Sequence, residues 1–276
     1  KLDNQANSVR LSAANLAQSV VGGAAGDTVG MVHNTTGRID LGVGADSLDV
    51  VVLADGVDIS AATLVGVDEL YVKDTGNVSV SVSAEDLGNG AEPRRVRTEA
   101  SASDVILAVS VQGALSGYTI DSDIDVLRLD NQASSVTLSG ANVGQTVVGG
   151  AGADVVRMVS GAVGTIDLSQ STGDTVVVGA GASIHGATLK GVEVLRLEGS
   201  GDVVVTVDAE HLNTAAESVG VVQKADPSAK AVLDVVGPLN GYTIHSGIDR
   251  LVLDDTANSV RLSQAAQSVV GGSSGD

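Results

Sequence analysis

The chain has 276 residues, and its 34 acidic against 15 basic side chains give a formal net charge of −19. Proteins that bind a nucleic acid backbone or an anionic membrane surface need a basic face, so this charge argues against both partners. Aromatic residues make up only 1% of the sequence, whereas apolar residues reach 43%. The core is therefore expected to consist of small aliphatic side chains, and the absence of Cys excludes disulfides and thiol chemistry.

A long internal repeat organises the chain. Its opening segment, Leu2–Val9, returns as Leu129–Val136 and again as Leu253–Val260. Later landmarks recur in the same order: Val20–Gly23 matches Val147–Gly150 and Val269–Gly272, Thr63–Leu70 matches Thr188–Leu195, and Gly117–Ile120 matches Gly241–Ile244. We therefore assign a first repeat unit to residues 1–127, a second to 128–251 and the start of a third to 252–276, and expect a segment of a longer array.

Within the repeats, the apolar pattern predicts short strands. Val50–Leu53 is a continuous apolar run, as is typical of a buried strand, and Val78–Val82 alternates strictly between Val and Ser. Val176–Val178 is a second continuous run. Gly-Asp pairs between such segments predict tight turns, and residues 83–87 and 208–212 predict single helical turns. Long amphipathic helices are not expected.

Many short Val-rich strands, small turns and a tandem repeat without large aromatics favour an all-β parallel β-helix or β-roll. In such a β-solenoid each coil stacks on the previous one, and small aliphatic side chains form internal ladders. The alternative is a string of β-sandwich domains, one for each long repeat. Sandwich cores usually contain aromatic residues, and this chain has only three Tyr. The β-solenoid is therefore the preferred prediction.

One Gly-rich turn fits a calcium-binding pattern. Residues 149–156 follow the nonapeptide G-G-x-G-x-D-x-U-x of parallel β-rolls, in which Gly carbonyls and an Asp carboxylate face a cation. Degenerate copies lie at residues 22–27 and 271–276. The candidate calcium ligands are Gly149, Gly150, Gly152 and Asp154, with Gly22, Gly23 and Asp27, and Gly271, Gly272 and Asp276. The alternative is a Gly-Asp turn that closes a coil without any ion.

These turns resemble those of repeats-in-toxin (RTX) proteins and related bacterial surface-layer proteins and giant adhesins. Leu64–Val72 and Leu189–Leu197 are also similar to the L-x-G-V-E-x-L-x-L coils of that group. The resemblance implies export by a type I system, calcium-assisted folding outside the cell, and a role in a coat, filament or attachment. The expected location is therefore extracellular, at the cell surface. The sparse nonapeptides depart from the family pattern.

Catalysis finds little support in the sequence, and the chain is not expected to be an enzyme. The four histidines, at positions 33, 185, 211 and 245, do not recur between repeats and are interpreted as exposed loop residues. No metal-ligand spacing typical of zinc sites is present. Arg94–Arg97 is the only basic run, interpreted as a surface loop or as part of an inter-subunit salt bridge.

The preferred function is a structural repeat segment of an extracellular surface layer, filament or matrix protein, with calcium as a candidate stabilising ion. The expected partners are neighbouring copies or repeats, with no nucleic acid and no direct membrane insertion. The second hypothesis is the stalk of a calcium-dependent adhesin, in which other regions would bind a cell-surface polysaccharide. The third is a β-helical polysaccharide-active enzyme, which would need a cleft lined by basic and aromatic residues.

Overall fold

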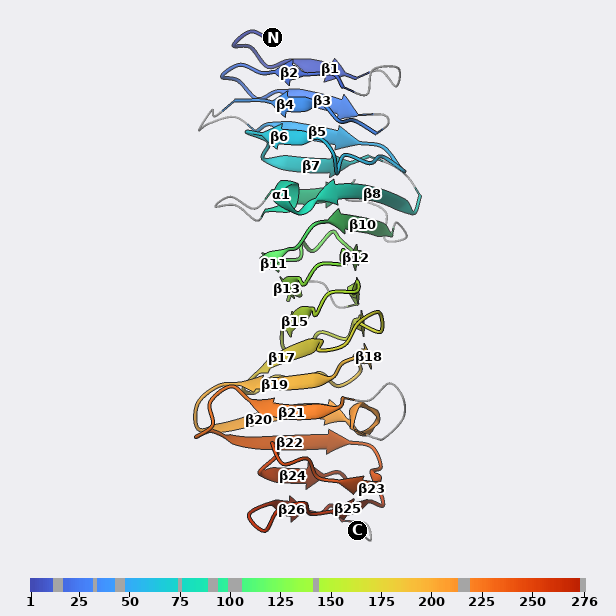
Figure 1. The fold of residues 1–276 in the computed structure, drawn as a ribbon, viewed down its shortest axis with the longest axis vertical. Coiled ribbons are helices and arrows are strands. Elements are labelled where there is room, and N and C mark those ends of the chain that lie inside the picture. The colour runs from blue at the N-terminus through green and yellow to red at the C-terminus, as the bar shows by residue number, and fades with distance from the viewer. Residues whose placement is uncertain are drawn as a thin grey trace. The chain divides into compact units, whose positions relative to one another are not determined.

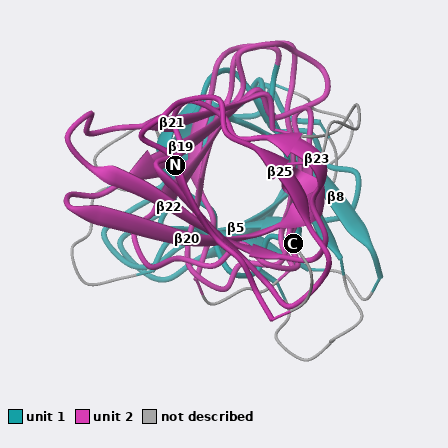
Figure 2. Ribbon diagram, turned by 90° about the horizontal axis from the view of Figure 1, so that it is seen from below, with its two compact units in different colours: residues 1–130 teal, residues 131–276 magenta. Residues whose placement is uncertain are grey.

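The computed structural model describes residues 1–11, 17–31, 34–42, 48–73, 76–88, 94–98, 106–140, 144–212 and 219–273. The chain divides into two compact units, residues 1–130 (unit 1) and 131–276 (unit 2), which Figure 2 shows in teal and magenta. Every strand pairing described within a unit is parallel. The protein is therefore all-β and folds as a parallel β-helix, as the sequence predicts.

In unit 1, the strands of successive coils form three sheets, and Figure 1 shows these coils stacked. The first sheet contains β1 (Ser8–Arg10), β3 (Thr28–Met31), β5 (Val50–Leu53), β7 (Glu69–Val72) and β9 (Arg95–Thr98). The second contains β2 (Val20–Val21), β4 (Arg38–Asp40) and β6 (Thr63–Val65). The third contains β8 (Val78–Ser83), β10 (Leu107–Gln112) and β12 (Val126–Arg128), and β11 (Ser116–Thr119) follows β10 along the chain.

Unit 2 repeats this arrangement and adds further coils. One sheet contains β13 (Ser135–Thr137), β15 (Val155–Met158), β17 (Thr175–Gly179), β19 (Val194–Glu198) and β21 (Val221–Lys224). A second contains β14 (Thr146–Val148), β16 (Thr165–Asp167) and β18 (Thr188–Lys190). A third contains β20 (Asp202–Asp208), β22 (Lys230–Val236), β24 (Arg250–Leu253) and β26 (Ser268–Val270), and β23 (Asn240–Thr243) pairs with β25 (Ser259–Arg261).

Aliphatic side chains in register fill the interior of each unit. In unit 1 one ladder of paired residues runs through Val9, Val29, Val51, Leu70 and Val96. Its counterpart in unit 2 runs through Val136, Val156, Val176, Leu195 and Val222. Apart from Val9, each of these side chains is at most 2% exposed. Burying one such side chain stabilises the fold by about 2 kcal/mol, so these ladders hold successive coils together.

The parallel pairing also decides between the two predicted architectures. A string of β-sandwiches would be built from antiparallel sheets packed face to face. The described strands instead pair with the equivalent strand of the next coil, and their equivalent buried residues lie 20 and 22 residues apart along the chain. The sandwich alternative is therefore wrong for the described parts of both units.

Two short helical turns follow the long strands β8 and β20. They are α1 (Ala84–Leu87) and the 3-10 turn η1 (Ala209–His211), which confirms the helical turns predicted at 83–87 and 208–212. Ser83 begins α1, because its hydroxyl accepts a hydrogen bond from the Asp86 amide at 3.1 Å. Within the described residues, no helix is long and apolar enough to cross a membrane.

Candidate functional site

The aspartates of the predicted calcium turns are buried between coils. Asp27 and Asp154 are both 0% exposed and lie directly before β3 and β15. The two carboxylate oxygens of Asp27 accept amide hydrogen bonds from Asn7 at 2.9 Å and Gly23 at 3.0 Å. Those of Asp154 accept bonds from the amides of Ser134 at 2.8 Å and Gly150 at 3.2 Å. Each aspartate therefore joins its own turn to the preceding coil.

The same contact continues through the following coils. In unit 1 the Asp27 amide donates to an Asp49 carboxylate oxygen at 2.7 Å, and the Asp49 amide donates to an Asp68 oxygen at 2.8 Å. We call these acids, one in each coil, the carboxylate ladder; Asp27 and Asp49 are buried, and Asp68 is exposed.

In unit 2 the carboxylate ladder runs through Asp154, Asp174 and Glu193. The Asp154 amide donates to Asp174 at 2.6 Å, and the Asp174 amide donates to Glu193 at 2.8 Å. The ladder therefore gives many otherwise unpaired amides at coil corners a strong acceptor, because hydrogen bonds to a charged acceptor are stronger than neutral ones.

Burial shifts the pKa of two members of the carboxylate ladder, Asp49 and Asp154. Desolvation raises the pKa of Asp154, opposed by the bonds from Ser134 and Gly150 and reinforced by the neighbouring Asp174. Desolvation likewise raises the pKa of Asp49. Placing acids in consecutive coils therefore works against their ionisation, while the amide donors favour it.

The predicted glycines are needed for close approach of successive coils. A Cβ at Gly22 would lie 2.6 Å from both the Leu41 carbonyl oxygen and an Asp27 oxygen, and one at Gly23 would lie 1.9 Å from the Asp3 carbonyl oxygen. Similar contacts with neighbouring coils arise at Gly149, Gly152 and Gly272. Gly150 donates its amide to Asp154, and Gly271 follows β26. Asp276 lies outside the described residues.

The calcium prediction concerned these same residues. Calcium is bound by oxygen ligands, and the described turns direct amide N–H groups at both oxygens of Asp27 and Asp154. A cation there would have to share those oxygens with the amide donors. Calcium binding by the Gly-Asp turns stays a prediction.

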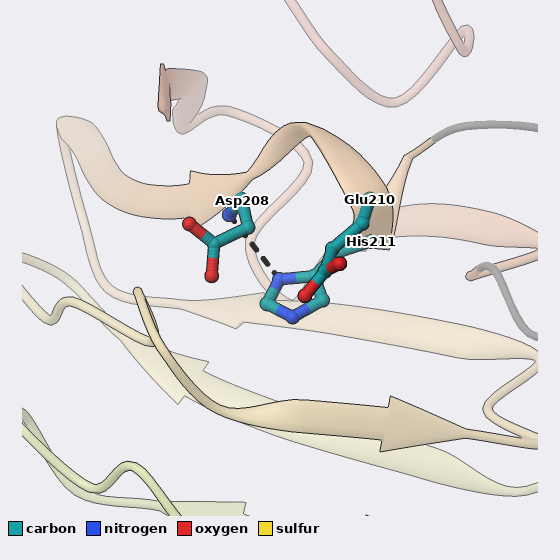
Figure 3. Close-up of side chains that lie close together, drawn as sticks. All are labelled: Asp208, Glu210 and His211. Atoms are coloured by element: carbon teal, nitrogen blue, oxygen red, sulfur yellow. Dashed lines mark hydrogen bonds between the residues drawn. The ribbon is translucent and has the colours of Figure 1, made fainter. Parts of the chain in front are cut away.

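A second cluster of polar groups lies in unit 2, where β20 leads into η1. Figure 3 shows Asp208, Glu210 and His211, whose ligand atoms lie within 4.8 Å of one another. His211 is buried, which makes its interpretation as an exposed loop residue wrong. Its Nδ1 accepts the Asp208 amide at 3.3 Å, and its Nε2 lies 2.9 Å from the Ala187 carbonyl oxygen, to which it can only donate. His211 is therefore a neutral structural histidine with both nitrogens occupied.

The carboxylate of Asp208 holds a second, exposed histidine. It contacts Nδ1 of His185 and accepts the Gly186 amide at 2.7 Å. His185 and Asp208 line an open pocket of about 530 Å³ together with Glu210 and Asn240. A carboxylate that orients an imidazole in this way leaves the other ring nitrogen directed away from it, as in general-base and metal-binding histidines. The sequence analysis missed this pair, which a spacing of 23 residues, close to one coil, could have indicated.

The position equivalent to His211 in unit 1 is Asp86, which is also buried. Arg94 donates to its carboxylate at 3.2 Å and also to the carbonyl oxygens of Leu64 and Val67. Desolvation raises the pKa of Asp86 and lowers that of Arg94, while the mutual attraction opposes both shifts. The basic run is therefore not a loop: strand β9 begins at Arg95, and Arg94 is a partly buried ion-pair partner of Asp86.

Comparisons with known proteins leave the description at the level of the fold. No protein-family model matches the chain. No curated protein and no solved structure matches it either.

Proposed function

We propose that this chain is a structural repeat segment of an extracellular bacterial surface layer, filament or matrix protein. The observation that carries this proposal is that the residues recurring between the repeats contact the neighbouring coil. In both units they form the contacts between successive coils: aliphatic ladders, the carboxylate ladder and close-approach glycines. A repeat whose recurring residues serve coil stacking is suited to building length and surface rather than to forming one reaction centre.

The extracellular location rests on the resemblance to RTX and surface-layer repeats. That resemblance lies in the Gly-Asp turns and in segments Leu64–Val72 and Leu189–Leu197. Calcium belongs to the proposal as an additional stabilising ion. The amide partners of Asp27 and Asp154 supply these carboxylates with positive partial charge without it.

One observation favours the enzyme alternative, namely the His185–Asp208 pair at an open pocket. The described residues that line this pocket are His185, Asp208, Ala209, Glu210, Val236, Gly237, Pro238 and Asn240. None of them is a Lys, an Arg or an aromatic residue, although binding of an acidic polysaccharide would use such side chains. The structural role is therefore the better supported of the two.

Immunogold electron microscopy on intact cells of the source organism tests the structural proposal. Antibodies raised against the purified chain should label the outer surface of intact cells, and permeabilisation should add little further label. Label found only after permeabilisation would overturn the extracellular role. Release of reducing ends or unsaturated sugars from acidic polysaccharides by the purified chain, lost in His185→Asn, would establish the enzyme alternative instead.

A further inference from the structure

The register of two neighbouring coils in unit 2 brings His185 and Asp208 together. Ser183 pairs with Thr206 in a parallel bridge, and the Ile184 amide donates to the Thr206 carbonyl oxygen at 2.9 Å. His185 and Asp208 each lie two residues further along, so the same register places them next to each other. Their side chains are in contact, from His185 Nδ1 to Asp208 Oδ1. The stacking of the coils therefore creates this pair from residues that are distant in the sequence.

Glu210 adds a second carboxylate from the turn that follows β20. Figure 3 shows it beside Asp208, and ligand oxygens of these two side chains lie within 4.8 Å of one another. Glu210 is exposed and has no ion-pair partner among the residues that the structure describes. The side chain of His185 is 57% exposed, and all three residues line the open pocket of about 530 Å³. The pocket therefore offers one imidazole and two carboxylates to a solute.

No basic side chain balances the two carboxylates. The described lining of the pocket contains neither Lys nor Arg, and the ion pair that the structure describes for Asp208 is the one with His185. Neighbouring ionised carboxylates repel each other, and a divalent cation between them removes this repulsion. An imidazole nitrogen beside carboxylate oxygens suits a transition metal such as zinc, whereas calcium and magnesium prefer oxygen ligands alone.

We propose that His185, Asp208 and Glu210 bind a divalent transition-metal ion of the zinc type in this pocket. The ion lies between His185 Nδ1 and Asp208 Oδ1 in place of a proton, and the imidazole then carries its proton on Nε2. Such ligands bind zinc at about 2.0 to 2.2 Å, so these two atoms need only move to about 3.4 Å apart. The exposed Glu210 side chain turns to supply a third ligand, and water completes the four positions that zinc prefers.

The backbone around the pocket orients the ligands before an ion binds. The second Asp208 oxygen accepts the Gly186 amide at 2.7 Å, which fixes the carboxylate. Nε2 of His211 donates to the Ala187 carbonyl oxygen at 2.9 Å and holds the loop that carries His185 against η1. Nδ1 of His211 accepts the Asp208 amide, so His211 keeps its structural role and is not a ligand. Groups oriented in this way lose little freedom on binding.

Unit 1 has the same backbone arrangement without the same ligands. The bridge recurs there between Asp58 and Ser81. The three ligand positions, each 125 residues earlier in the chain, hold Ser60, Ser83 and Glu85. The Ser60 hydroxyl donates to Asp58 at 2.5 Å, and the Ser83 hydroxyl donates to a carboxylate of its own turn at 2.7 Å. Only one of the three ligands remains, so unit 1 is an internal control that should not bind the ion.

Isothermal titration calorimetry with Zn²⁺ and the chelator-treated full chain tests the site. One zinc ion should bind per chain, and His185→Ser, Asp208→Ser and Glu210→Gln should each weaken binding at least about tenfold. Glu85→Gln and His245→Asn are the matched controls, because they change the equivalent carboxylate of unit 1 and another histidine, and they should bind like the wild type. Circular dichroism checks that each variant is folded. A wild type without a saturable site, or controls that weaken binding as much as the ligand variants, would overturn the proposal.

Cobalt and calcium test the class of ion. Co²⁺ should bind in place of zinc, and its visible absorption should change in His185→Ser, because a nitrogen ligand is lost. Calcium in about hundredfold excess should not displace zinc. Displacement by calcium, or a Co²⁺ spectrum that His185→Ser leaves unchanged, would overturn the assignment.

The metal site goes beyond the proposed structural function and does not depend on it. Surface labelling of cells without zinc binding at these residues would remove the metal site and leave the structural role in place. Zinc binding without surface labelling would do the opposite.

Discussion

The turns after β8 and β20 occupy equivalent places in units 1 and 2 but are stabilised differently. In unit 1 the buried position holds Asp86, which forms an ion pair with Arg94. In unit 2 it holds His211, which accepts the Asp208 amide and donates to the Ala187 carbonyl oxygen. Unit 1 thus uses an ion pair between a buried aspartate and a partly buried arginine, where unit 2 uses one neutral ring.

This difference shows which property of the side chain at that position the coil requires: hydrogen bonding to the backbone, and not a particular charge. Both arrangements lie beside the start of a neighbouring strand, where Asp86 accepts the Leu64 amide at 3.3 Å and Arg94 donates to the Leu64 carbonyl oxygen at 2.8 Å. The requirement is therefore that buried backbone groups at the corner find partners, whereas the charge of the side chain is free to vary. A neutral histidine meets the requirement without desolvating two charges.

The largest effect is expected from removing Arg94. Arg94→Ala leaves the buried Asp86 carboxylate without its cationic partner and removes the donor from four carbonyl oxygens, those of Leu64, Val67, Glu85 and Asp86. The free energy of unfolding should fall by about 3 kcal/mol, measured by urea unfolding monitored by circular dichroism. Combining it with Asp86→His, which imitates unit 2, should recover about 1 kcal/mol. No recovery in the double variant would show that the two turns are not interchangeable.

The reverse change in unit 2 should have a somewhat smaller effect. His211→Asp removes the donor to the Ala187 carbonyl oxygen and buries a carboxylate, and Gly220 stands before β21 where unit 1 has Arg94 before β9. The expected loss is about 2 kcal/mol in the same urea measurement. His185→Asn changes an exposed ring nearby and serves as the control, with little expected change. Equal stability of His211→Asp and wild type would contradict the structural role of His211.

The carboxylate ladder should be sensitive to loss of a single oxygen. Asp154→Asn keeps the size of the side chain, but its amide group can accept only one of the two bonds from Ser134 and Gly150. The free energy of unfolding should fall by about 1.5 kcal/mol, because the side-chain NH2 group of the asparagine then faces a buried backbone N–H donor, which loses its acceptor. Asp202→Asn, at an exposed position, is the control. A wild-type melting curve for Asp154→Asn would exclude the ladder as a source of stability.

Mild acidification should stabilise the protein. Asp49, Asp86, Asp121 and Asp154 all have a raised pKa, mainly through desolvation. A group with a raised folded-state pKa contributes stability that is complete below the unfolded value of 3.8 and is lost as the pH rises through the folded value. Unfolding free energy should therefore increase as the pH falls from 7 toward about 4.5.

Further acidification should reverse that trend. The pKa of Glu198 is lowered by its bond from Arg157, and that of Asp249 is lowered by bonds from Ala231 and Lys224 that outweigh its desolvation. Stability from groups with a lowered pKa is present above the unfolded value and is lost as the pH falls through the folded value. Thermal melts across this pH range test whether the melting temperature passes through a maximum. A melting temperature that declines steadily from pH 7 downward would contradict the prediction.

The smallest expected effect is that of chelation. The Gly-Asp carboxylates already accept amide bonds, so a calcium chelator should shift the melting temperature by less than about 2 °C if these turns are the only candidate sites. The matched measurement replaces the chelator with calcium at millimolar concentration and records the melting temperature again. A large and saturable rise in melting temperature with calcium would instead support the RTX-like ion role.

Much of the fold was predictable because the residues that form the strands and the contacts between coils recur at regular spacings in the sequence. The alternation at Val78–Val82 and the continuous run Val50–Leu53 correspond to β8 and β5, and the repeated segments indicated a stack. The site was less predictable. The Gly-Asp motif indicated a turn and an acidic side chain, but one of the two backbone donors to each aspartate lies 20 positions earlier, Asn7 for Asp27 and Ser134 for Asp154.

By itself the sequence determined the class of architecture: aliphatic residues at strand period, Gly at coil corners and a long repeat leave few ways to bury the apolar surface except a stack of parallel coils. Only the tertiary structure decided the roles of the polar residues. Whether an aspartate binds a cation or an amide depends on groups one coil away, as for Asp154 with the Ser134 amide and Asp86 with the Leu64 amide. Those distances are set by the register of the stacked coils, which neighbouring residues in the sequence do not encode.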